Sequence, residues 1–148
     1  MIISACLLGV RCRFDGESRP HKGILSCIDN EVLIPICPEQ LGGLPTPRSP
    51  AQIEGGSGDD VLSKKARVIN AAGTDVTSKF LAGAENALFI ARTLGVDKAI
   101  LKEKSPSCGV HYIKRNEEII EGTGVTSALL KKHGITVISS ERIFKEYV

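Results

Sequence analysis

Short apolar runs alternate with segments of helical periodicity along this chain, and that alternation limits the folds open to it. Four runs rich in isoleucine, leucine and valine have the length of buried strands, at residues 2–8, 31–37, 99–101 and 135–139. Strands that alternate with helices form a mostly parallel sheet covered on both faces. The pattern predicts a Rossmann-like α/β fold. Pro35 argues against a central position for the second strand, because proline removes a ladder hydrogen bond.

The helices and turns between these strands are marked by periodicity and by their end residues. The longest helix starts near the capping residues Thr74 and Asp75 and runs to about Leu94, where Gly95 ends it. Shorter helices are predicted over residues 22–30, 125–133 and 141–147. Turn residues indicate hairpins around residues 66–69 and 115–117, and glycine and proline make residues 40–50 a rigid loop.

Composition excludes several classes of protein. Over 148 residues, a hydrophobic content of 42% and a charged content of 24% are typical of one soluble domain, spanning residues 1–148. A net charge of +2 does not favour a nucleic-acid polymer or a membrane as partner. No apolar run reaches the length of a membrane span and no basic segment precedes the first strand, so we expect a cytoplasmic protein.

The cysteines are the most informative residues. Their number, five, is odd, and in a reducing compartment they indicate free thiols, a metal or a cluster rather than a disulfide framework. Cys6, Cys37 and Cys108 lie at or near predicted strand ends. Ligands of parallel α/β sheets bind at the carboxyl ends of the strands, so these three thiols are expected to converge on one edge of the sheet.

Spacing alone leaves the role of these thiols open. No CxxC pair is present, and the zinc-ribbon and ferredoxin spacings are absent, which favours ordinary buried cysteines. Small residues, glycine or proline beside each cysteine, nearby polar groups, and basic residues along the same loops favour a site for an anionic substrate. Taken alone, Glu39 is equally an acid at a helix N-terminus. Arg48 is equally a phosphate clamp or a surface charge.

Three motifs together carry a resemblance to a known family. They are SACLLGxxCRFDG from Ser4, CPExxGGLPTPRSP from Cys37 and LKEKSPSCG from Leu101. In this order they resemble the thiouracil desulfidase family over nearly the whole chain. The resemblance implies a compact α/β domain whose 4Fe–4S cluster is held by three cysteines, with one iron free of protein ligands. It also implies a non-redox reaction that converts thiouracil or 4-thiouridine monophosphate into the oxo base and hydrogen sulfide.

The resemblance assigns roles to particular residues. The cluster ligands would be Cys6, Cys37 and Cys108. The catalytic groups would be Glu39 as acid/base, Ser107 beside the reacting centre, and Asp15 as a polar partner of the base or water. The substrate-binding residues would be Arg48, Lys104 and Ser105.

Cys12 departs from the family pattern, because several relatives carry another residue there. We interpret it as a spare thiol and Cys27 as structural. An alternative is a non-catalytic, structural or redox-sensing cluster module in which Cys12 is the fourth ligand. A further alternative is a small nucleotide-binding α/β domain with incidental cysteines. The number of thiolates on the metal separates the first two, and the visible absorbance of a cluster separates both from the third.

Overall fold

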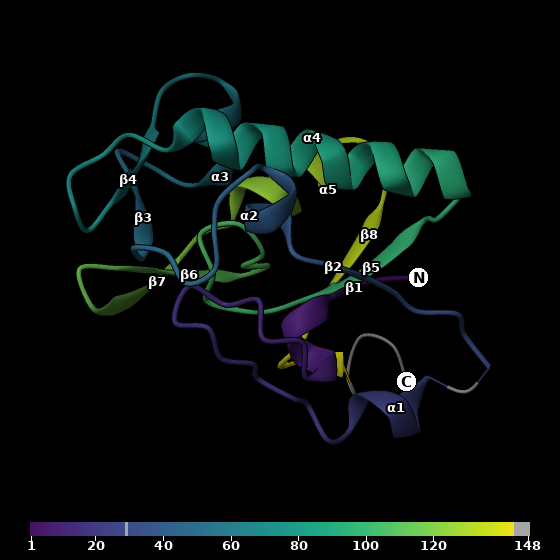
Figure 1. The fold of residues 1–148 in the computed structure, drawn as a ribbon. Helices are drawn as coiled ribbons and strands as arrows, with labels where there is room; N and C mark the ends of the chain where they lie inside the picture. Colours follow the sequence, from purple (N-terminus) through teal and green to yellow (C-terminus); the bar gives the residue numbers. More distant parts are fainter. Residues whose placement is uncertain (29, 144–148) are drawn as a thin grey trace.

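Four parallel strands form the central sheet of the computed structural model, which describes residues 1–28 and 30–143 (Figure 1). In spatial order they are β2 (Ile34–Ile36), β1 (Ile2–Ser4), β5 (Lys98–Leu101) and β8 (Thr136–Ser139). Each neighbouring pair is parallel. The predicted α/β fold with a parallel sheet is confirmed.

The strand order contains a reversal between β1 and β5. From β1 the chain moves outward to β2 on one side, and from β5 it moves outward to β8 on the other. The connections therefore diverge at the carboxyl ends of these two neighbours and leave a crevice there. Such a reversal is where open α/β sheets bind ligands.

Helices cover both faces of the sheet (Figure 1). Alternate residues of a strand point to opposite faces, so Ile3 and Ile100 pack in the same cluster as α1 while Ile2 and Leu101 pack with α4 and α5. The helices, in chain order, are α1 (Ile24–Cys27), α2 (Pro38–Leu41), α3 (Gly58–Leu62), α4 (Thr77–Leu94) and α5 (Val125–Lys132). None of the helices within residues 1–28 and 30–143 is long and apolar enough to cross a membrane.

Two antiparallel ribbons stand beside the sheet. The first pairs β3 (Ala51–Glu54) with β4 (Arg67–Asn70), and the second pairs β6 (Tyr112–Arg115) with β7 (Glu118–Glu121). The hairpin predicted at residues 115–117 is confirmed, and its turn residues Asn116 and Glu117 both have positive φ angles. A third apolar cluster, around Ile53, Phe80 and Ile113, joins the ribbons to α4.

Several predicted boundaries were wrong. The first strand ends at Ser4, because residues Ala5–Leu8 turn into a 3₁₀ segment, η1, that Gly9 closes with a φ of 99°. The second strand is limited to Ile34–Ile36, and Cys37 caps α2 in front of Pro38, within a region expected to be extended or loop. The helix predicted over residues 141–147 lies mostly outside the described residues.

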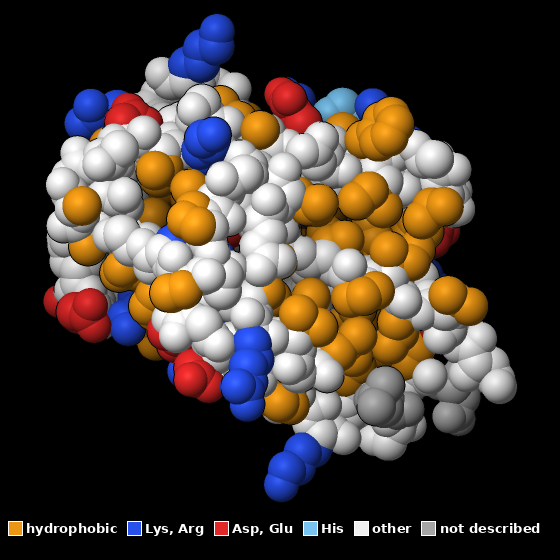
Figure 2. Space-filling model, in the orientation of Figure 1, with side chains coloured by type: hydrophobic (Ala, Val, Ile, Leu, Met, Phe, Trp, Pro, Cys, Tyr) orange, Lys and Arg blue, Asp and Glu red, His pale blue; other side chains and the backbone are white. Residues whose placement is uncertain are grey.

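The position of Pro35 follows from its chemistry. β2 is an edge strand, and Pro35 is exposed there. A missing N–H is tolerated at an edge, and proline discourages pairing with another chain. Apolar side chains gather on this side of the molecule, between α4 and α1 (Figure 2), and Val32 just before the strand is 79% exposed.

Two glycines bring α2 against α4. A Cβ on Gly83 would lie 1.9 Å from the carbonyl oxygen of Pro38, and one on Gly42 would lie 2.0 Å from that of Lys79. The Asn86 side-chain amide also donates a 2.8 Å hydrogen bond to the carbonyl of Leu41. Because α2 carries Glu39 and follows Cys37, this close contact fixes both residues relative to the sheet.

Candidate functional site

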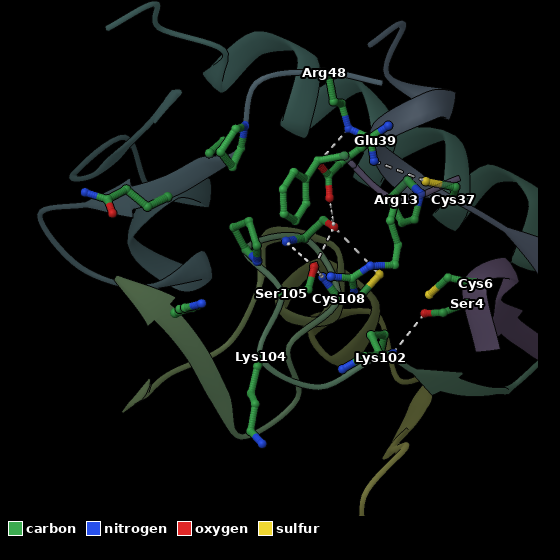
Figure 3. Close-up of a pocket in the computed structure, with 18 of the residues that line it drawn as sticks. Ser4, Cys6, Arg13, Cys37, Glu39, Arg48, Lys102, Lys104, Ser105 and Cys108 are labelled. Carbon is green, nitrogen blue, oxygen red and sulfur yellow. Dashed lines mark hydrogen bonds and ion pairs between the residues drawn. The ribbon is translucent and has the colours of Figure 1, made fainter. Parts of the chain in front are cut away.

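A pocket of about 720 Å³ lies at the carboxyl ends of β1, β2 and β5. The segments after these strands form one wall, and the two ribbons form the other. Four cysteines line it: Cys6, Cys12, Cys37 and Cys108. The predicted convergence of Cys6, Cys37 and Cys108 is confirmed (Figure 3). Cys12 also lines the pocket.

Cys12 lies between two of the predicted ligands. The Cys37 thiol donates to the carbonyl oxygen of Cys12 at 3.6 Å, and the Cys12 side chain interacts with those of Cys37 and Cys6. The contact with Cys12 lowers the pKa of Cys6 despite burial, and Lys102 and Arg13 act in the same direction. The contact with Cys12, together with burial, raises the pKa of Cys37 well above its ordinary value. Cys12 is only 2% exposed, so it belongs to the pocket wall.

Cys108 is the third predicted ligand in the pocket, and its thiol is buried. Burial raises the pKa of its thiol to about 12, so without a positive partner the group stays protonated. In the described part of the chain, no three Cys, His, Asp or Glu side chains are arranged around a single metal ion. The thiols are instead spread over the pocket wall, which suits a multinuclear cluster whose ligands each bind a different iron.

The loop that carries Cys108 is held by the N-terminus of α5. The N–H groups of Val125 and Thr126 donate to the carbonyls of Pro106 and Ser107, at 2.9 and 2.8 Å. These are N–H groups that a helix leaves without intrahelical partners. The Ser127 hydroxyl donates to the Cys108 carbonyl at 2.7 Å. The carbonyls of the loop therefore take the place of a side-chain cap, and these hydrogen bonds fix the loop to the helix.

Glu39 and Ser107 meet in the pocket although 68 residues separate them. The Ser107 hydroxyl lies 3.0 Å from Glu39 Oε2 and 3.7 Å from Cys108 Sγ. Ser105 Oγ lies 3.1 Å from Ser107 Oγ and accepts the N–H groups of Ser107 and Cys108. Ser105 thus orients Ser107 and the cysteine that follows it.

Arg48 reaches the pocket wall from the proline-rich loop. Its Nε donates to Glu39 Oε1 at 3.1 Å, in an ion pair whose two side chains are 5% and 16% exposed. Its Nη2 lies 3.8 Å from Cys37 Sγ. The arginine therefore contacts both the predicted acid/base residue and a predicted cluster ligand.

The remaining predicted residues lie at the rim. Lys104 lines the pocket and pairs with Glu141 at 2.9 Å. Asp15 is not among the residues that line the pocket. Its carboxylate accepts the N–H of Glu17, which holds its pKa below the ordinary value, and it pairs with Arg13 and Arg19. The structure places Asp15 where it orients arginines of the pocket.

Sequence reasoning missed Glu103. This side chain is 2% exposed, and its Oε1 accepts the N–H groups of Val110, His111 and Tyr112 at 2.7 to 3.0 Å. Its Oε2 accepts the Ser139 hydroxyl at 2.5 Å. Burial alone would raise its pKa, but these hydrogen bonds prevail and leave the pKa below its ordinary value. An acid between two lysines gives no sequence signal that separates it from a solvated charge.

The fold and the site define an α/β protein with a thiol-rich pocket at the carboxyl edge of a parallel sheet. The chain belongs to the 2-thiouracil desulfurase family, whose model matches residues 1–142. It is 41% identical over 146 residues to the uncharacterized protein YbbK of Bacillus subtilis (strain 168), covering 97% of each chain. Its structure is similar to that of the [4Fe-4S]-dependent thiouracil desulfidase TudS, with a TM-score of 0.84 and 38% identity over 98% of this chain and 93% of the other.

Replacement of Glu103 by glutamine is expected to destabilise the protein and to change its response to acid. An amide cannot accept the same set of hydrogen bonds, and each bond to a charged group contributes about 1.5–3 kcal/mol. The pKa of Glu103 in the folded protein is lower than its ordinary value of 4.5. At pH values between these two pKa values, the unfolded chain binds more protons than the folded protein. The free energy of unfolding of the wild type therefore rises with pH in this range. Urea unfolding on both sides of pH 4.5 should show a smaller loss of stability on acidification in Glu103→Gln.

The matched control is Glu121→Gln, at an exposed acid of β7. It should unfold at the wild-type urea midpoint. An acid response in Glu103→Gln equal to that of the wild type would mean that Glu103 does not contribute through its charge.

Proposed function

We propose that this chain removes sulfur from a thiolated pyrimidine without net redox change, using a [4Fe–4S] cluster held by Cys6, Cys37 and Cys108. The products are the oxo base and hydrogen sulfide. The observation that carries the proposal is that thiols from three strand ends share one pocket with the hydrogen-bonded pair Glu39 and Ser107. Membership of the 2-thiouracil desulfurase family and similarity to a [4Fe-4S]-dependent thiouracil desulfidase support it.

The donor set fits an iron–sulfur cluster. Thiolates are its usual protein ligands, and the pocket offers them without histidine or a converging carboxylate site for a harder ion. When bound, a cluster with one iron free of protein ligands supplies a soft Lewis acid for the sulfur of a thiocarbonyl. Lys102 and Arg13, which lie near Cys6, offset the negative charge of the thiolates.

Glu39 is the group that moves protons in this proposal. Oε1 is held by Arg48, so Oε2 is the oxygen that faces Ser107 and the interior of the pocket. There it accepts a proton from the attacking water while the new carbon–oxygen bond forms. As the carbon–sulfur bond breaks, the protons pass to the departing sulfide, and one water replaces one hydrogen sulfide with no electron transferred.

Ser107 completes this arrangement. Its hydroxyl lies between Glu39 Oε2 and Cys108 Sγ, at 3.0 and 3.7 Å. Because Ser105 and the N-terminus of α5 fix the loop, the hydroxyl has a defined position for orienting water or relaying a proton. Binding of the water in one orientation is the contribution expected of such a fixed group.

The size and charge of the pocket favour a nucleotide over a free base. A volume of about 720 Å³ is in the range that holds a ligand larger than one pyrimidine ring, even with a cluster bound. Arg19, Lys104 and Lys114 line it and provide positive charge for a phosphate. The ammonium of Lys104 has three N–H donors, so it can bind a phosphate while it remains paired with Glu141.

Comparison of two substrates that differ only in the phosphate tests this part of the proposal. We expect kcat/KM to be about 10- to 100-fold higher for 4-thiouridine monophosphate than for 4-thiouridine, from about 1.5–3 kcal/mol per hydrogen bond to a charged group. Lys104→Gln should reduce the ratio of the two kcat/KM values. Lys65→Gln, at an exposed residue that does not line the pocket, should leave this ratio unchanged. Equal kcat/KM values for the two substrates would leave the free base or nucleoside as the substrate.

The position of Cys12 raises one alternative, in which this residue is a fourth cluster ligand. Its thiol lies between Cys6 and Cys37, where a fourth ligand would close the cluster and leave no iron for substrate. We expect Cys12→Ser to retain the iron and sulfide content of the wild type after anaerobic reconstitution, and Cys108→Ser to lose both. Visible absorbance and iron analysis measure this. Loss of the cluster in Cys12→Ser would support the closed, non-catalytic module instead.

Glu39→Gln should keep the cluster and lower the rate of hydrogen sulfide release by roughly two to four orders of magnitude, the range for loss of a general acid/base. The substitution preserves size and removes the ability to accept a proton. A residue that only stabilised the N-terminus of α2 would cost about 0.3–1 kcal/mol of stability with turnover unchanged. Turnover is measured anaerobically and divided by iron content.

Glu85→Gln, at an exposed acid of α4, is the control and should match the wild type. Turnover per cluster near the wild-type value in Glu39→Gln would remove Glu39 from the mechanism.

A further inference from the structure

The hydrogen bonds of Arg48 account for every donor of its guanidinium. Nε donates to Glu39 Oε1, Nη1 to the carbonyl of Pro45 and to Thr46 Oγ1, and Nη2 to the carbonyl of Cys12 and toward Cys37 Sγ. These are five contacts at 2.9 to 3.8 Å, and a guanidinium has five N–H groups. The side chain is only 5% exposed.

This geometry leaves no donor for a substrate anion. A phosphate clamp presents unpaired N–H groups to its ligand, and Arg48 would have to break existing contacts to do so. Each buried acceptor left behind would cost about 1–3 kcal/mol. The expected role in substrate binding therefore does not follow from the position that Arg48 occupies.

We propose that Arg48 is a positioning residue that holds the acid/base carboxylate and one cluster ligand in a fixed relation. The inference rests on the proposed function. Its bond to Oε1 fixes Glu39 (Figure 3). Oε2 is then directed at Ser107. The Arg48 donor toward Cys37 Sγ acts on the cluster, because hydrogen bonds to a ligand sulfur stabilise the reduced state and raise the reduction potential.

The shape of the side chain explains why an arginine occupies this position. The five acceptors belong to the segment after β1, to the N-cap and first turn of α2, and to the proline-rich loop. A lysine has three donors on one nitrogen and cannot reach them together. The Pro45 carbonyl and the Thr46 hydroxyl accept hydrogen bonds from Nη1. Nε and Nη2 are then left to contact Glu39, Cys12 and Cys37.

Arg48→Lys tests the proposal, because it keeps the positive charge and removes the planar guanidinium with its five N–H donors. We expect kcat to fall about 10- to 100-fold, the usual cost of losing a partner behind a metal ligand, with KM nearly unchanged. The reduction potential of the bound cluster, measured by EPR-monitored titration, should become more negative. Arg92→Lys, at an exposed arginine of α4 that does not line the pocket, is the matched control and should leave kcat, KM and the potential close to wild type.

A double-mutant cycle separates the two contacts. In the Glu39→Gln background, Arg48→Lys should lower kcat little further, because its effect on catalysis acts through that carboxylate. The shift in potential should persist, because it acts through Cys37. A rise in KM with unchanged kcat and potential would overturn the proposal and restore a substrate-binding role.

Spectroscopy of the unsubstituted side chain tests the same contact without depending on how a variant folds. Pulsed EPR of the reduced cluster, in protein labelled with ¹⁵N-arginine, should detect an arginine nitrogen that persists in Arg13→Lys. Absence of that coupling would overturn the contact with Cys37. A wild-type protein that binds a cluster but releases no sulfide from any thiolated pyrimidine would instead refute the proposed function and leave this contact measurable.

Discussion

The site depends on the docking of residues 105–109 onto the N-terminus of α5. The backbone carbonyls of Pro106 and Ser107 accept the N–H groups that the helix presents, and Gly124 allows the approach, since a Cβ there would lie 2.4 Å from the Ser107 carbonyl carbon. The N–H groups of the first turn have no intrahelical partners, so the loop carbonyls satisfy them and the two segments are held together. Cys108 and the Ser107 hydroxyl therefore inherit their positions from the packing of α5 against α4 and the sheet.

Much of the fold follows from patterns that are local in the sequence. The apolar runs, the helix from Thr77 to Leu94 and the hairpin at residues 115–117 are visible because each is set by periodicity or by turn residues. The convergence of three cysteines also follows, because the carboxyl ends of parallel strands must share an edge. The 3₁₀ turn at Ala5–Leu8 does not, since alanine, cysteine and leucine continue the apolar pattern of the strand, and nothing local marks the end of the strand at Ser4.

The parts of the site that sequence did not predict are long-range polar contacts. The role of Glu103 depends on N–H groups seven to nine residues onward and on a hydroxyl from β8. The saturation of Arg48 depends on carbonyls and sulfur from two other segments. Neither composition nor spacing records such partners, and a charged residue in a loop has the same local signature whether it is buried or solvated. The contacts of Cys12 with Cys6 and Cys37 were not predicted for the same reason.

Glu103 and Arg48 carry opposite charges, and each holds loops of the pocket in place through several hydrogen bonds. The loops that carry the pocket residues are short of large apolar side chains, so hydrophobic burial cannot hold them. A buried ion with several hydrogen bonds can hold these loops, because each bond contributes about 1.5–3 kcal/mol. Every hydrogen-bonding group of the ion must be paired, since an incompletely paired buried charge destabilises the fold. The anion gathers the N–H groups of residues 110–112, and the cation gathers carbonyls, a hydroxyl, a thiol and Glu39. Since the partners of both ions come from segments far apart in the sequence, the pocket is rigid only when these segments are assembled around it.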